Sequence, residues 1–245
     1  MIQFFRKIRK RLLNENKIRT YLMYGLGEII LVVIGILIAL QINNEHESFK
    51  NKRIEESYLL SIKEDIKKDI SAINAYILDE YELKLQRLEL GRDFYKGEFV
   101  VNDTISFIND LQIAGEGPGF IWSGHTNTFN ELESTGNLRK IRNDSLRKKI
   151  IEYYSRLKIA GNKLDKYNTQ YADFINSIQY QNNDIPAKLD SFDKNYFMEK
   201  VNSSRFYQVC NLEITIAGRT RVWATIIVRR ANELLNLIDD YFTTL

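Results

Sequence analysis

The sequence contains very little cysteine, histidine and proline, and each shortage excludes a class of protein. One cysteine, Cys210, and two histidines, His46 and His125, occur among 245 residues. A single thiol excludes an internal disulfide, and these few groups cannot supply the usual ligand sets of a zinc site. We therefore expect no metal site and no cofactor. We expect Cys210 to be buried in a stripe of alanines; an intermolecular disulfide is the alternative.

Catalytic motifs are equally scarce. Ser123 and His125 lie close together in GFIWSGHTNT, but this stretch lacks the strand-turn-helix context of a nucleophile elbow. Paired acids such as Asp239 and Asp240 point in neighbouring directions on a helix and are expected to be solvated. The sequence therefore predicts that the protein is not an enzyme.

One long hydrophobic run stands out against the polar remainder. No charged residue occurs from Ile29 to Asn44, and at ~1.5 Å per residue a helix over 21–43 would cross a ~30 Å hydrocarbon core. A buried core helix is one alternative, but the rest of the chain is strongly polar. A cleaved signal peptide is another, but no small-x-small cleavage site follows the run. We predict an uncleaved signal anchor over 21–43.

The flanking charges predict the orientation of this anchor. Seven Lys and Arg residues precede Gly25 against one acid, whereas acids balance the bases that follow the run. Because cytoplasmic flanks collect Lys and Arg, we expect a bacterial inner-membrane protein with a cytoplasmic N-terminus and a periplasmic domain over 44–245. The tail also accounts for the basic pI of about 8.7, so we expect no nucleic-acid partner.

The N-terminal tail, residues 1–20, has helical spacing of its own apolar residues. Its cations would hold it at the inner leaflet of the lipid bilayer; these are Arg6, Lys7, Arg9, Lys10 and Arg11. A disordered tail that only sets topology is the alternative.

Three residues of the anchor share one helical face: Glu28, Gly35 and Ala39. If the spanning helix begins near Gly25 to Gly27, Glu28 lies in its first turn, where a carboxylate is favourable. The alternative is an ionisable group on a packing face, because Gly35 and Ala39 form a small-xxx-small pair that suits a second helix.

Two blocks of the chain carry a family resemblance. The first is the FFRKIRKRLLNENK tail followed by GEIILVVIGILIALQINN, and the second is TFNELESTGNLRKIRNDSLRKKIIEYY. The chain resembles a family of small single-pass bacterial membrane proteins, typical of Bacteroidetes, whose function is unknown. In that family a Trp often follows the Asn pair, where this chain has Glu45. The resemblance implies membrane localisation and transfers no catalytic residues.

The remaining sequence predicts an all-α fold, an elongated antiparallel bundle with three long helices. We expect these over 49–90, over 144–180 with a heptad seam, and over 204–242. The first either continues the anchor helix or starts separately after it. A short helix over 104–111 is capped by Asn102-Asp103, and Thr128 to Glu131 has the form of a capping box before Gly136. We expect both short helices at the end of the bundle far from the membrane, and residues 181–203 near the membrane.

The stretch 114–128 combines four glycines with Phe120, Trp122 and His125. It is either an apical loop whose Trp122 plugs the bundle or a binding surface for a ligand or a partner. Three functions follow. The first is a scaffold that forms a homo-oligomer or binds a partner membrane protein, and we favour it. The others are a ligand-sensing bundle and an accessory of an ion-driven membrane machine that uses Glu28.

Overall fold

The computed structural model describes residues 18–116, 124–164, 169–178 and 189–244, and every regular element within them is a helix. The predicted all-α fold is thus confirmed. The chain separates into two compact units, Met1–Glu56 and Ser57–Leu245, which we call unit 1 and unit 2. The predicted boundaries after residues 20 and 43 stay predictions.

Helix α2, Ile18–Ile73, contains the hydrophobic run. Among the described residues, it holds the one stretch that is long and apolar enough to span a membrane, near the N-terminus, and none of that stretch is buried. Its large apolar side chains, such as Leu31 and Leu37, are exposed.

The first long helix of unit 2 is the continuation of α2. It passes through a π-helical turn, η1 (Asn74–Asp79), into α3 (Glu80–Lys96). The predicted long amphipathic helix is confirmed, and it continues the helix that contains the hydrophobic run. It stops at Gly97, whose φ of 77° is the left-handed conformation that glycine adopts at helix ends. We call the two ends of unit 2 the Tyr58 end and the Gly97 end.

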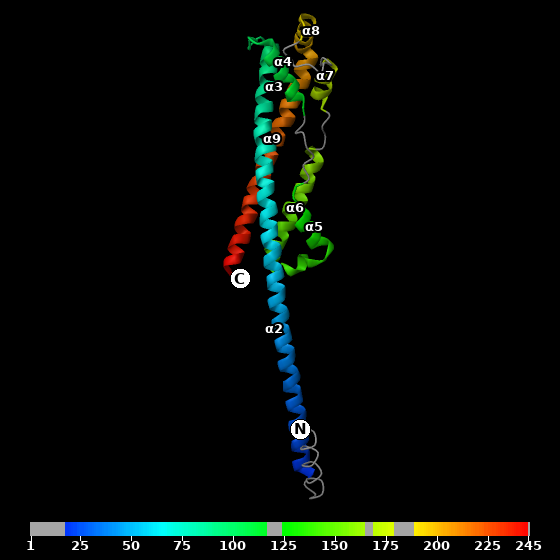
Figure 1. Cartoon of the computed structure of the whole chain (residues 1–245), viewed down its shortest axis with the longest axis vertical. Coiled ribbons are helices and arrows are strands. Elements are labelled where there is room, and N and C mark those ends of the chain that lie inside the picture. Colours follow the sequence, from blue (N-terminus) through cyan, green and yellow to red (C-terminus); the bar gives the residue numbers. More distant parts are fainter. Residues whose placement is uncertain (1–17, 117–123, 165–168, 179–188, 245) are drawn as a thin grey trace. The chain divides into compact units, whose positions relative to one another are not determined.

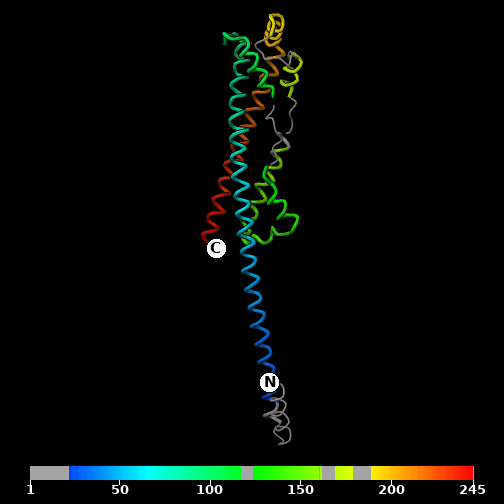
Figure 2. Tube along the Cα trace, viewed as in Figure 1, coloured from blue at the N-terminus to red at the C-terminus, as the bar shows by residue number. Residues whose placement is uncertain are grey.

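Helix α9, Ser204–Thr244, returns along α3 and α2 from the Gly97 end to the Tyr58 end (Figures 1 and 2). Ser203 caps it by accepting a hydrogen bond from the Phe206 N–H at 3.2 Å. The predicted stripe of small residues is buried and allows close helix approach: Cys210, Ala217, Ala224 and Ala231. The Cys210 thiol donates to the Leu88 carbonyl, and burial raises its pKa to about 12. The predicted burial of Cys210 is confirmed.

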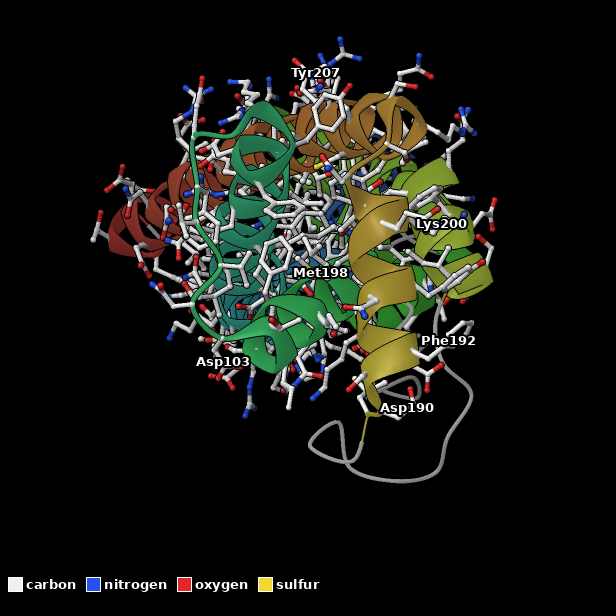
Figure 3. All side chains as sticks on the ribbon, turned by 90° about the horizontal axis from the view of Figure 1, so that it is seen from above. Asp103, Asp190, Phe192, Met198, Lys200 and Tyr207 are labelled. Atoms are coloured by element: carbon white, nitrogen blue, oxygen red, sulfur yellow. The ribbon has the colours of Figure 1, made fainter. Side chains whose placement is uncertain are left out.

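Shorter helices cover one side of the pair formed by α2–α3 and α9 (Figure 1). At the Tyr58 end these are α5 (Asn127–Ser134), the 3₁₀ turn η2 (Asn137–Lys140) and α6 (Asp144–Leu164). At the Gly97 end they are α4 (Thr104–Gly115), α7 (Gln170–Ile178) and α8 (Ser191–Val201), and Figure 3 shows α8 from above with Phe192 and Lys200 at its surface. Asp103 caps α4 through the N–H groups of Ile105 and Ser106, as predicted.

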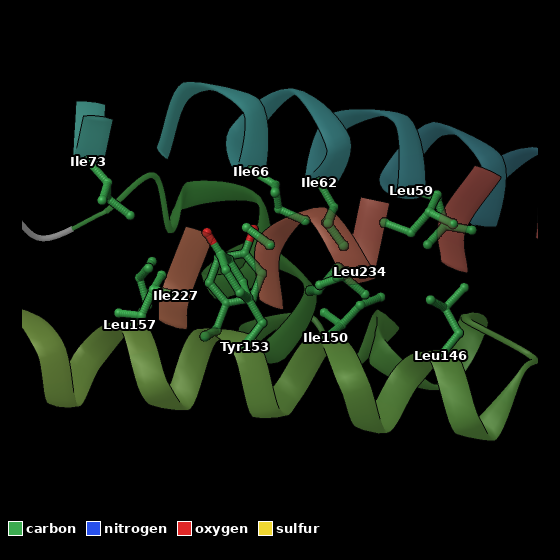
Figure 4. Packing of buried hydrophobic residues seen from close by; sticks show 14 of the residues in the cluster. Leu59, Ile62, Ile66, Ile73, Leu146, Ile150, Tyr153, Leu157, Ile227 and Leu234 are labelled. Carbon is green, nitrogen blue, oxygen red and sulfur yellow. The ribbon is translucent and has the colours of Figure 1, made fainter. Parts of the chain in front are cut away.

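The buried apolar residues described form two clusters, one toward each end of unit 2. Cluster 1 joins α2, α5, α6 and the C-terminal half of α9 through residues such as Ile66, Ile150 and Leu234 (Figure 4). Cluster 2 joins α3, α4, α7, α8 and the start of α9 through residues such as Leu111 and Phe206. Each long helix therefore contributes to both clusters.

The placement of two short elements differs from the prediction. Helix α5 lies at the Tyr58 end, because the Tyr58 hydroxyl donates to Glu131 at 2.8 Å and accepts from Asn137 at 3.1 Å. Residues 191–201, expected near the membrane, form α8 beside α4 and α7 at the Gly97 end. The capping box is also wrong, since Thr128 lies inside α5 and Thr126 precedes the helix. Gly136 follows α5 in a left-handed conformation, as predicted.

The second predicted long helix differs in length and direction. The heptad seam belongs to separate helices α6 and α7, and Thr169 starts α7 by accepting a hydrogen bond from the Ala172 N–H. Leu146 lies beside Leu59 and Leu157 lies toward Ile73 (Figure 4), so α6 runs parallel to α2. Because α5 lies at the Tyr58 end, α6 starts there, and of the two later helices predicted to be long, α9 opposes α2 as expected.

A buried ion pair lies on α3 and α9 between the two clusters. The Lys84 ammonium is 2.6 Å from Glu213, and both side chains are almost fully buried. Lys84 also donates to the Glu116 carbonyl at 3.3 Å and lies 5.6 Å from the ring centroid of Tyr81. Because a buried pair offsets the loss of hydration only when its geometry is good, Lys84 and Glu213 fix how α3 and α9 align.

We expect Lys84→Met to lower the free energy of unfolding by about 3–5 kcal/mol, because Glu213 would remain as a buried, uncompensated charge. The double variant Lys84→Met/Glu213→Leu should recover much of this loss. Thermal unfolding of the full-length protein in mild detergent, followed by circular dichroism, measures both. Additive losses in the double variant would contradict the assignment of a coupled pair.

Candidate functional site

Asp69 connects three segments of unit 2 that are far apart in the sequence. Its side chain is fully buried on α2. Oδ1 accepts from the His125 backbone N–H at 2.8 Å and contacts His125 Nδ1 at 2.9 Å, and Oδ2 accepts from the Tyr153 hydroxyl at 2.9 Å. A buried carboxylate needs such donors to replace its lost hydration. Asp69 thereby joins α2, the segment before α5, and α6.

The contact with Asp69 also determines which nitrogen of a neutral His125 ring carries the proton. Since Oδ1 is an acceptor, the proton of a neutral imidazole belongs on Nδ1, which leaves Nε2 available as an acceptor. The His125 side chain is 46% exposed although its partner carboxylate is fully buried. The ring is thus anchored at one edge and open at the other.

Tyr153 and Tyr154 lie on α6 within cluster 1 and next to Asp69. Burial raises the pKa of the Tyr153 hydroxyl well above its ordinary value, and the charge of Asp69 and its hydrogen bond raise it further. Burial likewise raises the pKa of Tyr154, and the charges of Asp65 and Asp69 add to the effect. Figure 4 shows Tyr153 in the space between α6 and α2. Both tyrosines therefore stay un-ionised in the folded protein.

Gly124 allows the chain to turn next to Asp69. Its φ is 70°, and a Cβ at this position would lie 2.2 Å from Leu157 Cδ2. A residue with a side chain would therefore meet both backbone strain and a steric clash. Glycine at this position lets His125 reach Asp69.

A shallow open hollow of about 510 Å³ lies on the surface of α2 beside His125. Lys67 and Lys68 line one part of it, and Ala75 and Tyr76 of the π-helical turn line another. Single π-helical turns within α-helices frequently occur at functional sites. The hollow thus combines an oriented imidazole, two cations and an irregular helical turn.

The charged groups that line this hollow can recognise a ligand of opposite charge. Ser71 also lines it, but its hydroxyl donates to the Lys67 carbonyl at 3.1 Å and is already engaged. No group of three or more His, Cys, Asp or Glu side chains suited to a metal occurs in the part of the chain that the structure describes. The two ammonium groups of Lys67 and Lys68 favour an anionic ligand.

The predicted anchor residues Glu28, Gly35 and Ala39 lie on α2 in unit 1. Because α2 includes residues from Ile18 onward, Glu28 lies beyond the first turn, and the prediction that it sits at the helix start is wrong. Apart from the chain neighbours of Gly35 and the nearby backbone of its own helix, no heavy atom of the described residues lies within 4 Å of a Cβ built on Gly35, so this position is open to a neighbouring helix.

Several predicted site residues lie outside the described part of the chain. These are Phe120 and Trp122 of the loop, and the tail residues Arg6, Lys7, Arg9, Lys10 and Arg11. His125 is the loop residue that the structure describes, and it lies in the site. Asp69 and Tyr153 were not predicted. Asp69 had a signal, because it occupies an apolar position in the series Ile62, Ile66, Asp69, Ile73.

Replacing each tyrosine with phenylalanine should separate their roles. Tyr153→Phe removes a hydrogen bond to a carboxylate and should lower the free energy of unfolding by about 1.5–3 kcal/mol. Tyr154→Phe is the matched control, because the Tyr154 hydroxyl is buried with no hydrogen-bond partner among the described residues, so its effect should be small. Denaturant unfolding of the full-length protein in mild detergent at pH 8 measures both.

Alkaline pH should lower the free energy of unfolding of the wild-type protein. A tyrosine whose pKa is raised in the folded state keeps its proton above pH ~10, whereas the unfolded chain loses it. This contribution to stability is therefore complete below pH ~10 and is lost as the pH rises further. Both Phe variants should reduce the slope of stability between pH 9 and 11, and an unchanged slope would contradict the assigned shifts.

Comparison with known sequences places this architecture in a family. No protein with curated annotation and no solved structure matches the chain. A family model matches residues 28–202, which include Glu28, most of the hydrophobic run, Asp69, His125 and Tyr153. The matched region covers more than half of the chain. The chain therefore belongs to the family of unknown function DUF6090.

Proposed function

We propose that this chain is a single-pass bacterial inner-membrane protein that acts as a non-catalytic scaffold. In this proposal the N-terminus is cytoplasmic, and the C-terminal domain, residues 44–245, is periplasmic. The protein associates with the lipid bilayer, forms a homo-oligomer or binds a partner membrane protein, and does not bind nucleic acid. The positive tail supports the orientation.

The observation that carries the proposal is the exposed apolar stretch of α2. Its side chains from Leu22 to Ile42 include many that are more than half exposed. So large an apolar surface is unfavourable in water and is satisfied by lipid or by another helix. Gly35 and Ala39 leave room on one face for close contact with a second spanning helix. Association through this face is the proposed basis of assembly.

The arrangement around Asp69 supports a scaffold rather than a catalyst. Asp69 and the Nδ1 edge of His125 hold three chain segments together. The Lys84–Glu213 pair serves a similar purpose between α3 and α9. In this proposal the buried polar groups of unit 2 keep its shape defined.

Gly35→Leu should shift the protein, extracted gently from its own membrane, from an oligomer or partner complex to a smaller native mass. The added side chain would hold the second helix away. Val33→Leu is the matched control, since it enlarges a residue on the opposite helical face and should leave the mass unchanged. Native mass spectrometry with identification of co-purifying chains measures this. A wild-type monomer without partners would refute the proposed assembly.

Glu28 supports a second candidate, an accessory of an ion-driven membrane machine. Its position within α2 rather than in the first turn leaves the helix-start explanation without support. An acid inside an apolar helix suits an ionisable role. Under this candidate Glu28→Gln preserves abundance and native mass but removes the phenotype that depends on the protein. If Glu28→Gln changes neither assembly nor phenotype, this candidate is excluded.

The proposed orientation is tested by cysteine labelling in intact cells with a permeabilised outer membrane. Because Cys210 is buried and its pKa is raised, it should give little background. Ser145→Cys, at an exposed position of α6, should react with a membrane-impermeant maleimide. Gln3→Cys should react only after the inner membrane is opened. The reverse pattern would invert the proposed topology.

A further inference from the structure

The hollow beside His125 has a polar part and an apolar part. Lys67 and Lys68 line the polar part together with one acid, Glu64. In the part of the chain that the structure describes, neither lysine takes part in a salt bridge. Two cations and one acid leave a single positive charge on the residues that line the polar part, and a protonated His125 would add a second, which suits an anion.

The apolar part is formed by small side chains and one aromatic ring. Ala72 and Ala75 lie on neighbouring turns and leave room above the helix. Tyr76 is 54% exposed, although it belongs to the same π-helical turn as the buried Ile77. The wider turn brings Ala75 and Tyr76 to the same surface as Ala72. A flat apolar group would cover this surface.

His125 lies where the hollow meets the segment held by Asp69. Its Nδ1 edge contacts a fully buried carboxylate at 2.9 Å, which holds the ring in one orientation. A ring held in this way loses little freedom when a ligand binds. Its open edge can donate to an anion when the imidazole is protonated.

We propose that this hollow binds a small organic carboxylate with a flat apolar body. The carboxylate lies between Lys67, Lys68 and the open edge of His125. The apolar body lies over Ala72, Ala75 and Tyr76. This site is independent of the proposed scaffold role, because its residues lie in unit 2 and the proposed contact face lies in unit 1.

The test uses 4-fluorobenzoate as the probe and the full-length protein in nanodiscs of zwitterionic lipid. Fluorine NMR titration should give saturable binding with a Kd on the order of millimolar, as befits so small a ligand in an open hollow. The neutral analogue 4-fluorobenzamide should bind at least about tenfold more weakly, because it lacks the charge that the lysines recognise. Empty nanodiscs provide the background from lipid partition.

Substitutions of the residues that line the hollow test whether the probe binds there. Lys67→Gln/Lys68→Gln removes the two exposed cations and should raise the Kd about tenfold or more. The matched control is Lys148→Gln/Lys149→Gln, which removes two exposed lysines of α6 and should leave the Kd unchanged. His125→Asn keeps a donor for Asp69 and loses the outer nitrogen, so it should weaken binding several-fold.

Three results would overturn the proposal: no saturable binding up to about 20 mM, equal binding of the amide, or an unchanged Kd in the Lys67/Lys68 variant. If His125→Asn does not fold, as judged by circular dichroism, the lysine variants decide the outcome, because their side chains are exposed. Failure of this test leaves the native-mass result of Gly35→Leu unaffected, so the two proposals fail separately.

Discussion

The buried carboxylate of Asp69 is the interaction on which the arrangement of unit 2 depends. A charge without water is tolerated only when donors surround it, and here those donors come from the segment before α5 and from α6. Asp69 therefore holds His125, which follows α4 in the sequence, at this level of α2. Together with the contacts of Tyr58 with Glu131 and Asn137, this interaction is consistent with the position of α5 at the Tyr58 end and with the parallel course of α6.

Much of the fold could be predicted from periodicity, because long amphipathic helices repeat their apolar positions many times. The helix through Leu59 and Leu88 and the alanine stripe of α9 were both expected and are both observed. The direction of α6 and the place of α8 could not be predicted in this way. A helical period states which face of a helix is buried but not which helix covers it. The direction was decided by contacts such as Tyr58 with Glu131, which join residues far apart in the chain.

The candidate site was only partly predictable, and the reason is specific. The glycine-rich neighbourhood of His125 indicated a binding surface, whereas Asp69 was not predicted as a site residue. Yet Asp69 interrupts the apolar series of α2, and Glu213 interrupts that of α9 between Cys210 and Ala217. A charged residue at an apolar position predicts a buried polar contact. The sequence alone does not identify its partner, because His125 and Lys84 could be found only once the helices were placed.

The Lys84–Glu213 and Asp69–His125 contacts differ in how much of each pair is exposed. This difference indicates that the first pair stabilises the fold, whereas the second can also contact a ligand. Lys84 and Glu213 are both nearly inaccessible, so their charges act on each other and on the alignment of α3 with α9. Asp69 is equally buried, but its partner His125 is nearly half exposed and borders the hollow next to the π-helical turn. The Nδ1 edge of His125 is held by Asp69 and the opposite edge is exposed, so the ring loses little conformational freedom when a ligand binds. Asp69 therefore stabilises the arrangement of unit 2 and also orients His125 at the surface where we expect unit 2 to bind a ligand.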